Sequence, residues 1–129
     1  MPRIILRTAP GRDEYVIWST VVDTYVLGPG TRDQVAHHLS TEWPVRLTDA
    51  AVQEILARVD GNGSSDRIGK FGWWDGEPLP VGEGAPDDGR YELPRDRLAA
   101  YVDAVEAGDE KAAQGLLVCW HRYDDEDDD

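Results

Sequence analysis

The sequence predicts an α+β fold in which a small, mostly antiparallel sheet packs against three or four helices. Three observations lead to this prediction. Two segments near the N-terminus are rich in β-branched and aromatic residues, which favour strands. A later segment has apolar residues at helical spacing. The chain has 129 residues, of which 40% are hydrophobic, and this is enough for a single domain, expected over residues 1–123, with its own core.

Two strands are expected at the beginning of the chain. Residues 3–8 predict the first, and Pro10 and Gly11 supply the turn that follows. The second, residues 15–22, has apolar side chains on both faces, which is typical of a central strand covered by helices. Its strand pattern can continue through residues 24–27 until glycine and proline end it.

Capping signals mark two helices in the middle of the chain. Residues 31–34 match a capping box, so a helix begins there and ends before Pro44. Thr48 is the expected N-cap of a second helix that runs to Asp60, where Gly61 supplies a left-handed stop. The buried stripe of this helix consists of Val52, Ile55, Leu56 and Val59.

The second half of the chain is rich in turn formers before it becomes helical again. Residues 60–89 hold eight of the 13 glycines. The dipeptide at positions 75–76 is Asp-Gly, which predicts a hairpin, and the prolines after it restrict the returning strand to a sheet edge. Further on, Pro94 begins a third helix, Asp109 caps a short fourth helix, and residues 117–123 predict a last strand.

The net charge is strongly negative and excludes several classes of protein. There are 26 acidic residues against 13 Lys and Arg, for a formal net charge of −13. Residues 124–129 are all acidic, and we expect this tail to be disordered because like charges repel one another. Direct nucleic-acid binding is not expected, since it requires clustered cations.

The chain has neither an apolar run of ~18 residues nor a signal-peptide core, which indicates a cytoplasmic protein that does not enter membranes.

No group of residues predicts catalysis or cofactor binding. Residues 60–66 place oxygen-bearing side chains at alternate positions, as a calcium loop does. However, Ser65 and Phe71 stand where such a loop needs Gly and Glu, so a glycine-terminated helix followed by a turn is the preferred interpretation. Cys119 lies in an apolar stretch that predicts a buried side chain. The histidines do not converge on one ion; they are His37, His38 and His121. We expect no enzyme, no metal and no cofactor.

The predicted site of partner binding is the pair of adjacent aromatic residues Trp73 and Trp74, beside the glycine-rich turn. On a strand, adjacent Trp side chains face opposite sides, so if one fills the core we expect the other to be exposed. Exposed Trp is enriched at binding hot spots, and nearby acids would complement a basic partner. The alternative is that both Trp residues are structural. The candidate contact residues are Trp73, Trp74, Asp75, Glu77, Asp87 and Asp88.

The order of several short segments carries a resemblance. They are WSTVVD at 18–23, TRD at 31–33, DGNGSS at 60–65, GWWD at 72–75 and LPRDRL at 93–98. Together they resemble a group of short uncharacterised proteins of actinobacteria and actinobacteriophages. Tyr25 departs from that pattern, which has proline or alanine there, and the acidic tail extends beyond it. The resemblance implies an accessory gene of a phage or mobile element and transfers no catalytic residue.

These observations favour a non-enzymatic cytosolic protein that binds a host protein, as a monomer or weak dimer. Two other classes remain open. One is an acidic nucleic-acid mimic that blocks a DNA-binding protein, because carboxylates can imitate the spacing of phosphates. The other is a small metal-dependent or hydrolytic enzyme.

Overall fold

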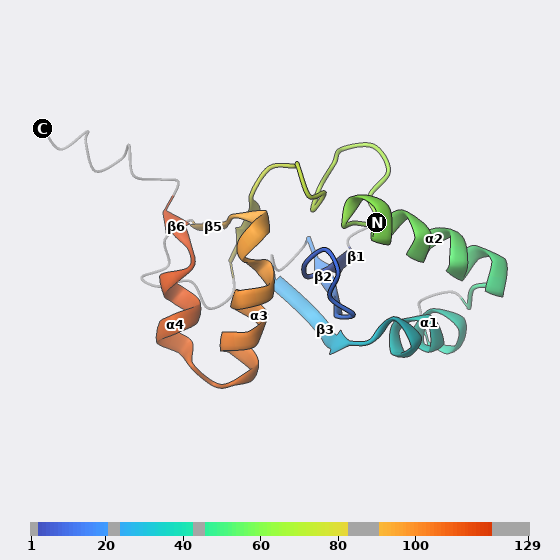
Figure 1. The fold of residues 1–129 in the computed structure, drawn as a ribbon, viewed down its shortest axis with the longest axis horizontal. Helices are drawn as coiled ribbons and strands as arrows, with labels where there is room; N and C mark the ends of the chain where they lie inside the picture. The colour runs from blue at the N-terminus through green and yellow to red at the C-terminus, as the bar shows by residue number, and fades with distance from the viewer. Residues whose placement is uncertain (1–2, 21–23, 43–45, 83–90, 120–129) are drawn as a thin grey trace, which may run out of the picture.

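The computed structural model describes residues 3–20, 24–42, 46–82 and 91–119, and these have the expected α+β architecture (Figure 1). They form two three-stranded antiparallel sheets and four α-helices. The strands are β1 (Arg3–Arg7), β2 (Tyr15–Ser19), β3 (Thr24–Gly30), β4 (Leu79–Val81), β5 (Tyr91–Leu93) and β6 (Val118–Cys119). The helices are α1 (Arg32–Thr41), α2 (Asp49–Asn62), α3 (Leu98–Glu106) and α4 (Glu110–Gly115). The predicted acidic tail lies outside the described residues.

The first sheet has the order β1-β2-β3, so β2 is its central strand, as predicted. The prediction that residues 24–27 continue β2 is wrong, because the chain reverses after Ser19 and returns as β3, antiparallel to β2. Gly28 allows this close return. Its φ is +98°, and a Cβ there would lie 2.8 Å from the carbonyl oxygen of Tyr15. A larger residue would therefore push β3 away from β2.

The alternation of side chains along β2 produces two cores, one on each face of the first sheet. Val16 and Trp18 belong to a core shared with the second sheet and α3, whereas Tyr15 and Ile17 belong to a core shared with α1 and α2. Figure 1 shows α1 and α2 on one side of the first sheet and α3 and α4 on the other. Both faces of β2 are apolar because both are covered.

The N-terminal caps of α1 and α2 are those that the sequence predicts. Thr31 and Gln34 form the capping box of α1, and the Thr48 side chain accepts a hydrogen bond from the amide of Ala51 at the start of α2. The end of α2 differs from the prediction. Gly61 lies inside the helix, and Gly63, with a φ of +95°, is the left-handed C-cap. Gly61 adopts helical dihedral angles, so the helix continues through it. Gly63 ends the helix, and its carbonyl oxygen accepts a hydrogen bond from the amide of Arg7 on β1.

The predicted hairpin at residues 75–76 is wrong. Phe71 to Trp74 are not in a strand, and the amide of Gly76 instead donates to the carbonyl oxygen of Trp73 in a tight turn. The second sheet has the order β4-β5-β6, in which β4 pairs with β5. Pro80 lies in β4, an edge strand, as the missing amide hydrogen of proline requires.

The residues that begin the two C-terminal helical segments are those that the sequence predicts. Pro94 is the N-cap of a single 3-10 turn, η2 (Arg95–Arg97), which leads directly into α3. Asp109 caps α4 by accepting a hydrogen bond from the amide of Ala112. The chain then enters β6, which pairs with β5, so the predicted last strand is present in the described part of that segment.

Candidate functional site

Residues 66–77, which we call the aromatic loop, are held together by Asp66. Its carboxylate accepts a hydrogen bond from the amide of Phe71 at 3.0 Å, and its carbonyl oxygen accepts one from the indole Nε1 of Trp73 at 2.8 Å. The amide of Asp66 donates to the Oγ of Ser64 at 3.0 Å. These bonds connect the start of the loop to Phe71 and Trp73 in its middle, so this part of the loop has a defined conformation although it contains no strand or helix.

The tip of the aromatic loop points into solvent. Residues 67–70 are all exposed, and Ile68 is 93% exposed, the highest value among the large hydrophobic residues described. Lys70 has a φ of +58°, and its ammonium group lies 5.5 Å from the ring of Trp73 and 3.8 Å from the carboxylate of Asp75. The loop thus presents an aliphatic side chain and, two residues further along the chain, a cation that the carboxylate of Asp75 partly neutralises.

Both Trp residues of the predicted site are half-buried, and they do not lie on opposite faces of a strand. Trp73 packs toward the loop tip. Trp74 packs toward the core, where the guanidinium carbon of Arg95 lies 4.5 Å from the centre of its ring. The amide of Trp74 also donates to the carbonyl oxygen of Asn62 at 2.7 Å. Of the two, Trp73 is therefore the better candidate for contact with a partner.

Arg95 positions the base of the aromatic loop, and the sequence analysis missed it. Its side chain donates to the carbonyl oxygens of Arg7, Thr8, Gly63 and Gly72, which belong to three separate segments. The residue is only 5% exposed, and no described carboxylate forms an ion pair with it. Burial lowers the pKa of Arg95 to about 10, which still leaves the guanidinium charged at neutral pH.

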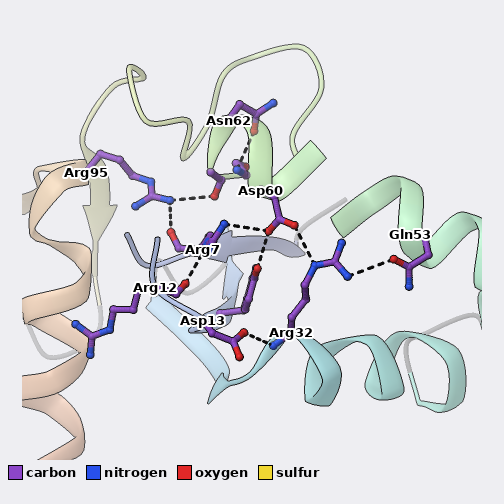
Figure 2. Close-up of polar contacts among 11 residues, drawn as sticks. Arg7, Arg12, Asp13, Arg32, Gln53, Asp60, Asn62 and Arg95 are labelled. Atoms are coloured by element: carbon purple, nitrogen blue, oxygen red, sulfur yellow. Dashed lines mark hydrogen bonds and ion pairs between the residues drawn. The ribbon is translucent and has the colours of Figure 1, made fainter. Parts of the chain in front are cut away.

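Asp60 is the centre of a second polar network, which Figure 2 shows. One carboxylate oxygen accepts from the hydroxyl of Tyr15 at 2.6 Å and from Arg7 at 3.4 Å, and the other accepts from Arg32 at 3.0 Å. Arg32 also donates to Gln53 at 3.2 Å. Burial, followed by the hydrogen bond to Asp60, raises the pKa of Tyr15 to about 12, so this hydroxyl remains a donor at neutral pH. The network joins both N-terminal strands to α1 and α2.

This arrangement removes the calcium interpretation of residues 60–66. Asp60 would be the first ligand, but its carboxylate is shared between two guanidinium groups and a phenol. The side chain of Asn62 accepts a hydrogen bond from the amide of Ser64 at 2.9 Å, as in the turn that the sequence favours. Within the described ranges, no group of three or more His, Cys, Asp or Glu side chains is placed to hold a metal ion.

The acidic candidates divide into two groups. Asp75 and Glu77 are exposed on the aromatic loop, next to Trp73 and Trp74. Burial, followed by the charge of Glu77, raises the pKa of Glu92 on β5. Asp87 and Asp88 lie outside the described residues. Four of the six predicted contact residues therefore lie in the described part of the chain, all within the aromatic loop.

The comparisons with known proteins leave this site to be interpreted from its own geometry. The sequence matches no known protein family, and it has no significant match among curated proteins or solved structures. None of the helices in the described residues is both long and apolar enough to cross a membrane.

Proposed function

We propose that this chain is a non-enzymatic, cytoplasmic protein that binds another protein through the aromatic loop. The observation that carries the proposal is the position of Ile68, which is 93% exposed at the tip of a hydrogen-bonded loop. An aliphatic side chain that stays in water gains little hydrophobic free energy on folding. It gains hydrophobic free energy only when a partner covers it.

Other residues of the aromatic loop support a contact surface. Trp73 is half-buried beside the tip and retains part of its ring for a partner, while the loop hydrogen bonds reduce the entropy lost on binding. Asp75 and Glu77 are exposed beside it. Together with the formal net charge of −13, these acids favour a basic partner through long-range attraction.

The resemblance to actinobacterial and phage proteins supports a more specific proposal. In this proposal the chain is an accessory protein of a phage or mobile element, and its partner is a host protein. An accessory protein of this kind acts by occupying a partner surface, which needs a defined contact loop and no catalytic group.

The test is a pair of matched surface variants in a capture experiment from actinobacterial lysate. Ile68→Ser removes the exposed side chain at the loop tip, and Val26→Ser removes a side chain that is 41% exposed on β3. We expect the native chain and Val26→Ser to retain the same partner, and Ile68→Ser to retain it about tenfold less or worse, as for a hot-spot residue. Equal retention by all three proteins would contradict the proposal.

Salt dependence separates this function from nucleic-acid mimicry. A contact centred on Ile68 and Trp73 is apolar, so partner capture should survive roughly 0.5 M salt, where the Debye length is only a few ångströms. A mimic that works through carboxylates would release its partner at that salt concentration, and duplex DNA would compete with it. Capture that disappears in salt and in the presence of DNA would favour the mimic instead.

A further inference from the structure

A cavity of about 680 Å³ lies between β3 and the pair formed by α3 and α4, away from the residues of the aromatic loop. Tyr25 on β3 and Tyr101 on α3 line it, as do Val105, Glu106 and Glu110. The volume is in the range of sites that hold small molecules or a long side chain.

The described residues that line this cavity carry charge of one sign. Glu106 and Glu110 both line it, and none of the described lining residues is Lys or Arg. Elsewhere in the described structure, two exposed carboxylates pair with a cation: Asp103 with Arg12 at 2.6 Å and Asp75 with Lys70 at 3.8 Å. Two carboxylates thus line one cavity without a cation among its described walls, and a bound cation would compensate their negative charge.

The Tyr25 hydroxyl fixes the position of one of these acids. It donates to the Oε2 of Glu106 at 2.7 Å, across the gap between β3 and α3. Burial, followed by this hydrogen bond, raises the pKa of Tyr25, so the phenol stays protonated. A carboxylate has about four acceptor sites, so Glu106 can still accept hydrogen bonds from a ligand.

The remaining walls suit the carbon-bearing part of a cation. Tyr25 and Tyr101 both line the cavity, and aromatic rings attract ammonium and guanidinium groups. Val105 is 39% exposed there, and Leu117 also lines the cavity. A metal ion would gain nothing from such walls, whereas an alkyl chain ending in a cation would contact both the apolar and the acidic parts.

We propose that the cavity between β3, α3 and α4 binds an organic cation, an alkylammonium or guanidinium group, with Glu106 and Glu110 as its counter-ions and Tyr25 and Tyr101 as its aromatic walls. Such a group is available as a free amine or as a lysine or arginine side chain of another protein. The site is formed by different residues from the aromatic loop and does not depend on the function proposed for that loop.

The test is a titration of the full chain followed by NMR of its backbone amides. The probes are butylammonium and methylguanidinium, with butanol as the uncharged control. We expect both cations to shift the amide signals of residues 24–25, 101–106 and 110–117, and butanol to leave them nearly unchanged. Butanol binding as well as butylammonium would overturn the proposal, since the acids would then have no role.

Matched variants test whether the two glutamates act as counter-ions. Glu110→Gln removes one counter-ion at an exposed position, and we expect affinity for both cations to fall about fivefold, the range of a solvent-exposed ion pair. Glu54→Gln removes an exposed acid on α2 and should leave affinity unchanged. The double variant Glu106→Gln, Glu110→Gln should lose measurable binding. Unchanged affinity in the double variant, with the fold intact by circular dichroism, would overturn the assignment.

Blocked tripeptides distinguish the two sources of the cation. Acetyl-Gly-Lys-Gly-amide and acetyl-Gly-Arg-Gly-amide carry the same cations on a backbone. Binding at least as tight as that of the free cations would support a protein side chain as the ligand. Binding of the free cations alone would support a small amine, and failure of all four charged probes would overturn the proposal.

Discussion

The guanidinium carbon of Arg95 lies 4.5 Å from the centre of the Trp74 ring. This contact joins the aromatic loop to the segment that leads into α3, although the two residues are 21 positions apart in the sequence. Because Arg95 also donates to carbonyl oxygens of Gly63 and Gly72, it fixes the end of α2 and the middle of the loop at the same time. The proposed contact surface is therefore positioned by one buried cation that does not itself reach the tip.

Arg95→Lys should destabilise the protein strongly. Lysine keeps the charge, but its single ammonium group cannot replace a planar fork that donates to four carbonyl oxygens in three segments. We expect the free energy of unfolding in urea to fall by about 3 kcal/mol. Arg97→Lys is the matched control, because Arg97 donates to one exposed carbonyl oxygen, that of Leu116. Equal losses in the two variants would contradict the role given to Arg95.

Two glycines of α2 should respond oppositely to alanine. At Gly63 the φ is +95°, and a Cβ would lie 2.8 Å from Trp74 and 2.9 Å from Arg95, so Gly63→Ala combines backbone strain with a clash. At Gly61, inside the helix, a Cβ would meet no atom within 4 Å. We expect Gly61→Ala to raise the free energy of unfolding by about 0.5–1 kcal/mol and Gly63→Ala to lower it by more than 1 kcal/mol, both measured by urea denaturation. A gain in both variants would contradict the observed end of α2.

The sequence predicts the local features of this fold well because local physics determines them. The Thr31 capping box and the Thr48 N-cap satisfy amides within three residues, so they are visible in the sequence. The alternating side chains of β2 likewise predict two buried faces without knowledge of what covers them. From these features, the α+β class and the central position of β2 are predicted correctly.

The errors arise where distant residues decide the structure. Asp75 and Gly76 are a strong hairpin signal, but Asp66 binds Phe71 and Trp73 and keeps that segment out of a strand. Gly63 ends α2 because its carbonyl oxygen is met by the amide of Arg7 and the side chain of Arg95, from distant parts of the chain. A helix-start pattern around Pro94 gives no sign that the next residue is buried, and only the assembled fold shows it.

Tyr15→Phe should change how stability depends on pH. The folded pKa of Tyr15 is raised to about 12, above the ordinary value of 10.0. Its contribution is therefore fully present below pH 10, and it is lost as pH rises from 10 to 12 because the unfolded chain ionises first. We expect Tyr15→Phe to cost about 1.5–3 kcal/mol at pH 8, the value of a hydrogen bond to the charged Asp60.

The measurement for Tyr15 is urea unfolding of the native chain and the variant at pH 8 and near pH 11. The stability difference between the two proteins should shrink at the higher pH, because only the native chain loses the contribution of this phenol. Tyr25 and Tyr101, whose pKa values are also raised, ionise in both proteins and cancel in the comparison. A difference that stays constant or grows with pH would contradict the hydrogen bond between Tyr15 and Asp60.

Alanine variants of the two adjacent Trp residues should show which indole ring stabilises the fold and which one is available to a partner. Trp74 stacks on the buried Arg95 and lies against Gly63, so Trp74→Ala leaves a cavity beside a charge and should lower the free energy of unfolding by about 3 kcal/mol. Trp73 donates one hydrogen bond to Asp66 and packs beside the exposed Lys70, so Trp73→Ala should cost about 1 kcal/mol. Chemical denaturation followed by far-ultraviolet circular dichroism measures both values. If Trp73→Ala proves the more destabilising of the two, Trp73 belongs to the fold, and Ile68 would have to carry the proposed partner contact without it.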